Sequence, residues 1–412
     1  MTRHSVLRLL ASAFLMTLLL LQVGEAWAQR MPKRAVVEVA DGVYAATGYA
    51  SNNMGFVVTD EGVVVIDTGM TPKLGQAFLD DIRRYTDQPV RYVIFTHYHY
   101  DHTDGAPVFR EEGAQFVAQE NLIWNLANLK GLEHINQQVL GDPKESPPLD
   151  IDISYGDSYE LTLGGRTIIL YHALGETDDA TLVWLPEEEV IFIGDLNNAN
   201  LGSPVMPEGF ADGFVAAVDL IESLQPGVLV PGHGRIEDTT LESLQAMRAV
   251  TDWLMQAVRE SVNAGRNLEE TLASVVMPAE FAADPLLAET FRACREPYIN
   301  RLHKNYTGYY GRNPVTYRPT PAVRRSALLA ELAGGNAELL AVAERIRATE
   351  PQLALEVLDA VIRNEPDNAA ALKLMADTYL AVARDDPELN WYHRQAYFNA
   401  ARKLRVTARG LQ

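Results

Sequence analysis

Cysteine is almost absent from this sequence of 412 residues. Its single cysteine, Cys294, allows no disulfide within the chain and excludes a zinc site built from several cysteines. Basic residues are also scarce: 35 lysines and arginines stand against 55 acidic residues, which leaves a net charge of −20. Such an acidic chain repels the phosphate backbone of nucleic acids, so we expect no nucleic-acid partner.

Long apolar runs are lacking as well, apart from one near the N-terminus. Residues 9–21 are mostly apolar, arginines precede them, and Ala26-Trp27-Ala28 follows as a cleavage motif. This pattern predicts a secretory signal peptide over residues 1–28, because the run is short for a membrane-spanning helix. An uncleaved anchor is the alternative. We therefore expect a periplasmic or secreted protein with no stable membrane anchor after signal cleavage.

Histidine is concentrated in one stretch. His97, His99 and His102 lie within six residues, together with Asp101, although the whole chain has only nine histidines. The apolar residues 93–95 directly before them predict a buried strand, so the polar side chains should leave the sheet at its C-terminal edge. Imidazole and carboxylate together suit zinc and similar divalent ions. The alternative is a polar loop in which histidines gather by chance.

Other apolar runs predict the rest of a sheet-rich N-terminal region. The predicted strands cover residues 36–47 with a turn at 41–42, 55–59, 63–66, 90–95, 115–117, 159–163, 166–170, 181–185, 190–193 and 228–230. Between two of them a helix should begin at Thr71-Pro72, with threonine as the N-cap. Its core-facing stripe should consist of Leu74, Phe78, Ile82 and Tyr85. Strand, helix and strand in this order form a βαβ unit, which indicates an α/β fold.

Three further segments are expected to be helical. Residues 121–140 predict an irregular helix, whose side chains either line a pocket or form an ordinary buried face. The side chains concerned are Trp124, Leu126, Asn128 and Leu129. Residues 240–264 predict a long helix, and the chain from residue 322 onward is almost entirely helical, with the spacing of tetratricopeptide-like helix pairs.

The order His-x-His-x-Asp-His over residues 97–102 resembles the metal-binding signature of the metallo-β-lactamase superfamily at every signature position. The resemblance implies an αββα sandwich and a cofactor of two Zn²⁺ ions. It also implies that Asp67, in an Asp-x-Gly element at a strand end, orients the ligand imidazoles. Later elements of the superfamily follow in the expected order, each at the end of a predicted strand.

By this resemblance the chain holds two groups of three metal ligands. One metal would be bound by His97, His99 and Glu176, and the other by Asp101, His102 and His233. Asp195 would bridge the two ions, and Asp101 is also the catalytic candidate. Two cations a few ångströms apart lower the pKa of a shared water, which provides hydroxide near neutral pH.

Within the superfamily, the sequence resembles the alkyl sulfatases. These enzymes use a glutamate at the position of Glu176, where most members have histidine. Residues 306–314 resemble a tyrosine-rich stretch of the alkyl sulfatases, and residues 331–335 and 391–397 resemble their dimerisation domain. The resemblance implies a catalytic domain at 29–265, connecting helices and the tyrosine-rich loop at 266–319, and a helical dimerisation domain at 320–412 that forms a homodimer.

The sequence departs from the alkyl sulfatases near the substrate. Alkyl sulfatases usually have a glutamate at the position of Asp195 and an arginine after it that binds sulfate. Residues 196–234 contain no arginine or lysine, and offer Asn197, Asn198 and Asn200 as substrate contacts instead. Alkyl sulfatases also usually continue into a sterol-carrier-like domain, which this sequence does not contain.

These residues support three hypotheses. The first is a dinuclear zinc hydrolase that cleaves sulfate esters of alkyl or aryl alcohols, its small-molecule substrates, by metal-activated hydroxide. The second is a related hydrolase of lactone, β-lactam or phosphoester substrates, which Asp195 and the missing arginine favour. The third is a helical adaptor with a vestigial metal site, against which the complete ligand set argues.

Overall fold

The computed structural model describes residues 34–50, 52–129, 146–200, 209–308, 313–386, 389 and 391–411. The expected signal peptide and part of the tyrosine-rich loop lie outside these residues. The described residues form two compact units, the first ending at residue 245 and the second beginning at 246. Each unit is described by itself below.

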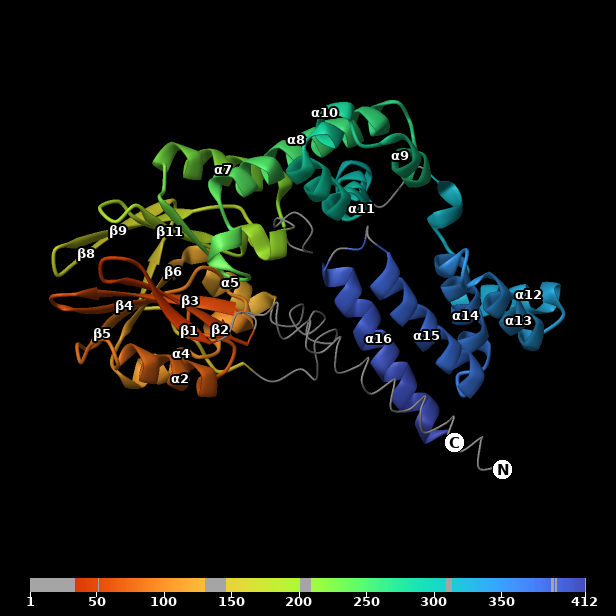
Figure 1. The fold of residues 1–412 in the computed structure, drawn as a ribbon, viewed down its shortest axis with the longest axis horizontal. Coiled ribbons are helices and arrows are strands. Elements are labelled where there is room, and N and C mark those ends of the chain that lie inside the picture. The colour runs from red at the N-terminus through yellow and green to blue at the C-terminus, as the bar shows by residue number, and fades with distance from the viewer. Residues whose placement is uncertain are drawn as a thin grey trace. The chain divides into compact units, whose positions relative to one another are not determined.

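The first unit contains two β-sheets (Figure 1). The seven-stranded sheet consists of β1 (Ala35–Ala40), β2 (Val43–Tyr49), β3 (Asn52–Thr59), β4 (Gly62–Ile66), β5 (Val90–Ile94), β6 (Gln115–Gln119) and β7 (Ile153–Tyr155), in sequence order. Strands β1 to β4 are antiparallel, and β4 to β7 run parallel to one another. The predicted βαβ unit around β4 and β5 is therefore present.

The five-stranded sheet is built mainly from hairpins. It consists of β8 (Ser158–Leu163), β9 (Arg166–His172), β10 (Thr181–Leu185), β11 (Val190–Gly194) and β12 (Val228–Pro231), in the order β12-β11-β10-β9-β8. Only β12 joins in parallel, alongside β11. This parallel pairing brings the ends of β11 and β12, and hence Asp195 and His233, to the same edge of the sheet.

The two sheets face each other across an apolar core. Apolar side chains of both sheets form this core, among them Val57 and Ile94 on one side and Val183 and Phe192 on the other. Gly55 has no side chain because the ring of Phe192 occupies that space. Burial of these side chains is the main driving force that holds the sheets together.

Helices cover the outer faces, which gives the predicted αββα arrangement (Figure 1). On the seven-stranded sheet, α2 (Pro72–Ile82), α4 (Ala106–Glu111) and α5 (Glu120–Asn128) contribute to a second apolar cluster. Helix α7 (Ala211–Leu224) lies by the other sheet in Figure 1 and buries its own apolar face. Thr71 caps α2 as expected, since its hydroxyl accepts from Leu74 N at 3.2 Å.

Two expectations about helix faces are wrong. Tyr85 lies beyond the end of α2 and is 46% exposed, and Leu79 is buried on the helix instead. In α5, Trp124 is 57% exposed, whereas Leu122 and Asn125 are fully buried. The side chains of Leu126 and Leu129 are only partly buried and Asn128 is exposed, so the expected buried face is shifted along the helix.

The second unit is helical. Its helices are α8 (Leu241–Asn263, which begins in the first unit), α9 (Leu268–Ser274), α10 (Ala279–Ala283), α11 (Pro285–Thr307), α12 (Ala322–Ala333), α13 (Asn336–Ile346), α14 (Pro351–Asn364), α15 (Ala369–Asp385) and α16 (Trp391–Gly410). The last five share an apolar cluster. Among the described residues no single helix meets the length and hydropathy test for a membrane span, and the pair α12 and α13 meets it only jointly, across a bend of 86°.

Candidate metal centre

The histidine-rich stretch leaves the seven-stranded sheet at the C-terminal end of β5. His97 and His99 lie on the connecting loop, and the short helix α3 (Tyr100–Thr103) then carries Asp101 and His102. His97, His99 and His102 are at least 92% buried. The loop therefore directs these side chains inward, at the sheet edge where the sequence predicted them.

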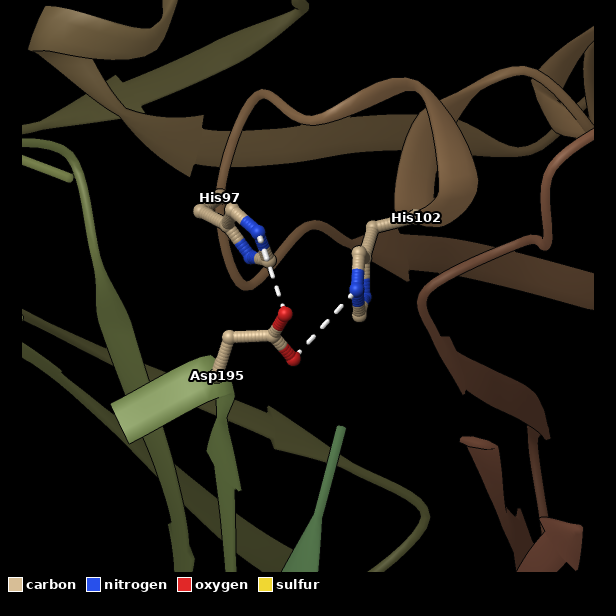
Figure 2. A group of neighbouring side chains, drawn as sticks. All are labelled: His97, His102 and Asp195. Atoms are coloured by element: carbon tan, nitrogen blue, oxygen red, sulfur yellow. Dashed lines mark ion pairs between the residues drawn. The ribbon is translucent and has the colours of Figure 1, made fainter. Parts of the chain in front are cut away.

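Three groups of ligand atoms come together at this edge, each group within 4.8 Å. They are His97, His99 and Glu176; Asp101, His102 and His233; and His97, His102 and Asp195. Figure 2 shows the last of these, with Asp195 Oδ2 3.9 Å from His97 Nε2 and Oδ1 3.4 Å from His102 Nε2. Asp195 thus lies between the two ligand groups that the sequence predicted.

His233 reaches the centre from the loop after β12. Its Nε2 lies 3.0 Å from Asp195 Oδ2 and 3.2 Å from Asp101 Oδ2. The residue before it, Gly232, has no side chain because Asp195 Oδ1 occupies the space of a Cβ atom. Asn53 fixes this loop, since its Nδ2 donates to the carbonyls of Pro231 at 2.9 Å and Gly234 at 3.0 Å.

Asp67 orients His102 from behind. Its Oδ2 accepts from His102 Nδ1 at 2.8 Å, so Nδ1 carries the proton and Nε2 faces the centre. Thr96 donates to the same carboxylate through its N–H and its hydroxyl, both at 2.8 Å. Asp67 adopts a left-handed backbone conformation with φ of 58°, which aspartate tolerates better than most residues.

Glu176 lies in the turn between β9 and β10 and is 98% buried. Its Oε2 has no hydrogen-bond partner among the described residues. A buried carboxylate oxygen without a partner is costly, and a cation is one way to satisfy it.

Burial and charge together shift the protonation of the centre in the metal-free protein. Burial and neighbouring imidazoles lower the pKa of His97 well below its usual range. Burial also acts to lower the pKa of His102 and of His233, but nearby carboxylates, Asp195 first, outweigh it and raise both pKa values. Burial and the charge of Asp195 raise the pKa of the Glu176 carboxyl well above its usual range.

The donor set fits metal ions. His97 Nε2 and His99 Nδ1 lie only 3.0 Å apart, a spacing at which two imidazoles must share either a proton or a cation. Together with a Glu176 oxygen they form a group of two nitrogens and one oxygen, and the second group has the same composition. Such ligand sets suit zinc and similar borderline divalent ions.

The three predicted substrate asparagines follow Asp195 in the 3₁₀ turn Asp195–Asn200. Asn197 is 98% buried. The side chains of Asn198 and Asn200 lie outside the described residues. Asn197 is thus buried two residues after Asp195, and the role of the three asparagines in substrate binding stays a prediction.

Thr96 and Asn53 were not predicted from the sequence. The position of Thr96 directly before His97 could have indicated a role at the metal centre. Nothing in the sequence indicated such a role for Asn53, because 181 residues separate it from Gly234, the residue whose carbonyl it binds.

Two family models match the chain. The metallo-beta-lactamase superfamily model covers residues 47–249, and the alkyl sulfatase dimerisation model covers residues 267–407. The chain joins a metallo-β-lactamase domain to an alkyl sulfatase dimerisation domain. Every residue of the centre described above lies within the metallo-β-lactamase domain.

Two curated relatives match most of the chain, and a third matches about half of it. A linear primary-alkylsulfatase of Pseudomonas sp. is 22% identical over 84% of this chain and 72% of its own length. An alkyl/aryl-sulfatase of Saccharomyces cerevisiae is 21% identical over 89% of this chain, which spans 63% of that protein. A metallo-beta-lactamase type 2 of Bacillus cereus is 23% identical over 52% of this chain and 78% of its own length.

A solved structure has the same fold over most of the chain. The stereoselective inverting sec-alkylsulfatase of Pseudomonas sp. matches with a TM-score of 0.78 and 19% identity. The match covers 90% of this chain and 66% of that one. The succession of a metallo-β-lactamase domain and a helical domain is therefore shared with a known alkylsulfatase, as the sequence predicted.

Proposed function

We propose that this protein is a metal-dependent hydrolase of sulfate esters of alkyl or aryl alcohols. The observation that carries the proposal is the likeness to alkyl sulfatases, which spans 84% of the chain in one relative and includes both domains. The ligand groups at the sheet edge supply the chemistry that such a reaction needs.

The cofactor in this proposal would be a pair of Zn²⁺ ions, one for each of the two ligand groups that the sequence predicted, with Asp195 shared between them. Zinc ions there would lower the pKa of a water molecule and accept negative charge from the transition state. The two groups share no side chain with each other, whereas Asp195 is near both His97 and His102. This geometry supports two ions better than one.

The protein's own side chains hold this centre in place. Asp67 keeps the proton of His102 on Nδ1, which leaves Nε2 free to bind. The Asp101 side chain is 13% exposed, more than that of Asp195 at 3%, and its Oδ2 lies 3.2 Å from His233 Nε2. In that position it can orient a water molecule toward a bound ester, which fits its role as the catalytic candidate.

The sulfate group would rest on neutral donors in this proposal. Asn197, Asn198 and Asn200 occupy the segment in which alkyl sulfatases use an arginine, and residues 196–234 contain no arginine or lysine. Amide donors form weaker bonds to an anion than charged donors do. We therefore expect weak sulfate binding and broad specificity for the organic group.

Two features favour a second candidate, a related hydrolase of lactone, β-lactam or phosphoester substrates. They are an aspartate at position 195 and the absence of a basic residue after it. A panel of alkyl and aryl sulfates, lactones, β-lactams and phosphoesters, assayed with metal-replete protein, separates the candidates. The proposal expects turnover of sulfates, whereas inert sulfates beside a hydrolysed lactone or phosphoester would replace it by the second candidate.

Location and assembly complete the proposal. Residues 1–28 would direct the protein to the periplasm or outside the cell, and the mature chain would begin near Gln29. Intact mass of the protein from the periplasmic fraction tests this. The helical dimerisation domain would join two copies into a homodimer, which light scattering tests.

A further inference from the structure

Two asparagines of α5 converge on the turn that carries Glu176. Asn121 Nδ2 donates to the carbonyl of Asp178 at 2.8 Å, and Asn125 Nδ2 donates to Asp178 Oδ1 at 2.7 Å. His172, at the end of β9, also donates from Nε2 to the Asp178 carbonyl, at 2.8 Å. Three side chains from two elements thus bind one residue that lies two positions after Glu176.

We propose that Asn121, Asn125 and His172 are positioning residues that hold Glu176 in the geometry required for metal binding. The inference rests on the proposed function, in which Glu176 is a metal ligand. We name these three side chains, together with their acceptor Asp178, the Asp178 clamp.

One carboxylate oxygen of Glu176 depends on the backbone of the turn for its position. Glu176 Oε2 has no hydrogen-bond partner among the described residues, so no such bond fixes that oxygen. The turn has two backbone bonds of its own, from Gly175 N to Thr177 O at 3.2 Å and from Ala173 N to Ala180 O at 2.8 Å, and Phe210 N donates to Gly175 O at 3.1 Å. The Asp178 clamp attaches this short turn to α5, and thereby to the seven-stranded sheet.

Asn125 is a poor choice for stability alone. It is fully buried, and its Oδ1 has no hydrogen-bond partner among the described residues. A buried amide that is only half satisfied costs free energy, whereas leucine has the same number of side-chain heavy atoms, the same branched shape and no polar atom. The asparagine is explained if its one bond, to Asp178, serves the metal centre.

The spacing of the two asparagines supports the same role. Residues 121 and 125 are four apart on α5, so both side chains lie on one face of the helix. One binds the main chain of Asp178 and the other binds its side chain, which restricts both the position and the rotation of that residue. A hydrogen bond to the main chain alone would leave the Asp178 side chain free to rotate. A hydrogen bond to the side chain alone would not fix the position of its main chain.

The test compares Asn125→Leu with Asn128→Leu. Asn128 is exposed and its side chain bonds only within α5, to the Trp124 carbonyl, so it is the matched control. Zinc affinity is measured by competition with a chromophoric chelator, and the melting temperature is measured on the metal-free protein. We expect Asn125→Leu to weaken zinc binding by about 10–100-fold, the usual effect of losing a residue that supports a metal ligand. Its metal-free melting temperature should not fall, and the control should change neither quantity.

A swap of the two partners tests the bond itself. Asn125→Asp places a second carboxylate against Asp178 and should weaken zinc binding. Adding Asp178→Asn restores a donor and an acceptor in reversed order, so the double variant should recover most of the affinity. Unchanged zinc affinity in Asn125→Leu would overturn the inference, as would a loss of affinity that follows a loss of metal-free stability.

A companion variant separates this inference from the proposed function. If Glu176 is a ligand, Glu176→Gln weakens zinc binding whether or not the Asp178 clamp matters. If Glu176→Gln binds zinc like the parent protein, the ligand assignment fails, and the inference fails with it. If Glu176→Gln loses zinc while Asn125→Leu retains it, only the inference fails.

Discussion

Gly232 should tolerate no side chain, and Gly232→Ala therefore tests how tightly the metal centre is built. A Cβ atom there would overlap Asp195 Oδ1 and lie 3.0 Å from His102 Cε1. The backbone of Gly232 is held in place, because its N–H donates to Gly194 O at 2.7 Å and its carbonyl accepts from Asn53 N at 2.6 Å. Asp195 must therefore move, by about 1 Å if ordinary carbon–oxygen contact is to be regained.

A displacement of that size has measurable consequences. A misplacement of about 1 Å in a catalytic centre can cost roughly 100-fold in rate, and overpacking of a dense site costs about 1–3 kcal/mol of stability. The assay is zinc content by elemental analysis together with ester hydrolysis. The control is Gly227→Ala, whose Cβ would meet Glu189 only at ordinary contact distances of 3.5 Å or more. If the two variants bound zinc and turned over substrate equally, the close approach of Gly232 to Asp195 would be wrong.

Three further predictions concern the metal and the assembly. In Asp67→Asn the new residue also tolerates the left-handed backbone, but it presents an amide to His102 Nδ1 in place of a carboxylate. Zinc affinity, measured by competition with a chelator, should therefore fall about 10–100-fold. An equal affinity would refute the orienting role of Asp67. Because Glu176, His102 and His233 have raised pKa values in the metal-free protein, they hold protons that zinc must displace, so zinc binding should release protons and the affinity for zinc should rise with increasing pH. Calorimetry in buffers of different ionisation enthalpy measures this release, and a pH-independent affinity without proton release would contradict it. Leu332 of α12 is 76% exposed in the dimerisation domain, so Leu332→Glu should shift a dimer toward monomer in light scattering, and an unchanged dimer would place the interface elsewhere.

The candidate ligands were predicted from their resemblance to the motifs of the metallo-β-lactamase superfamily, and the apolar strands before them indicated only that they would lie at sheet edges. Strands of one sheet that run in the same direction end at one edge, so His97 after β5 and Asp67 after β4 had to come close. The same reasoning applies to Asp195 and His233, at the ends of the parallel strands β11 and β12. The order of strands in the second sheet was not predictable, because a local sequence pattern does not choose among possible strand pairings.

Contacts between distant segments were not predictable. The bond from Asn125 to Asp178 spans 53 residues, and no local pattern distinguishes this asparagine from an exposed one. The exposure of Trp124 was missed for a related reason, since apolar residues occur on both faces of α5 and tertiary packing decides which face is buried. Gly232 was visible only as part of a turn, and its need for space became clear once Asp195 lay beside it.

The most direct test of the central claim is a zinc titration of the metal-free protein, followed by the release of inorganic sulfate from a medium-chain alkyl sulfate. Two separate ligand groups with Asp195 close to both predict that sulfate release rises with added zinc and reaches its plateau near two equivalents per chain. Sulfate release that is independent of zinc, or a complete lack of release at saturating zinc, would contradict the account.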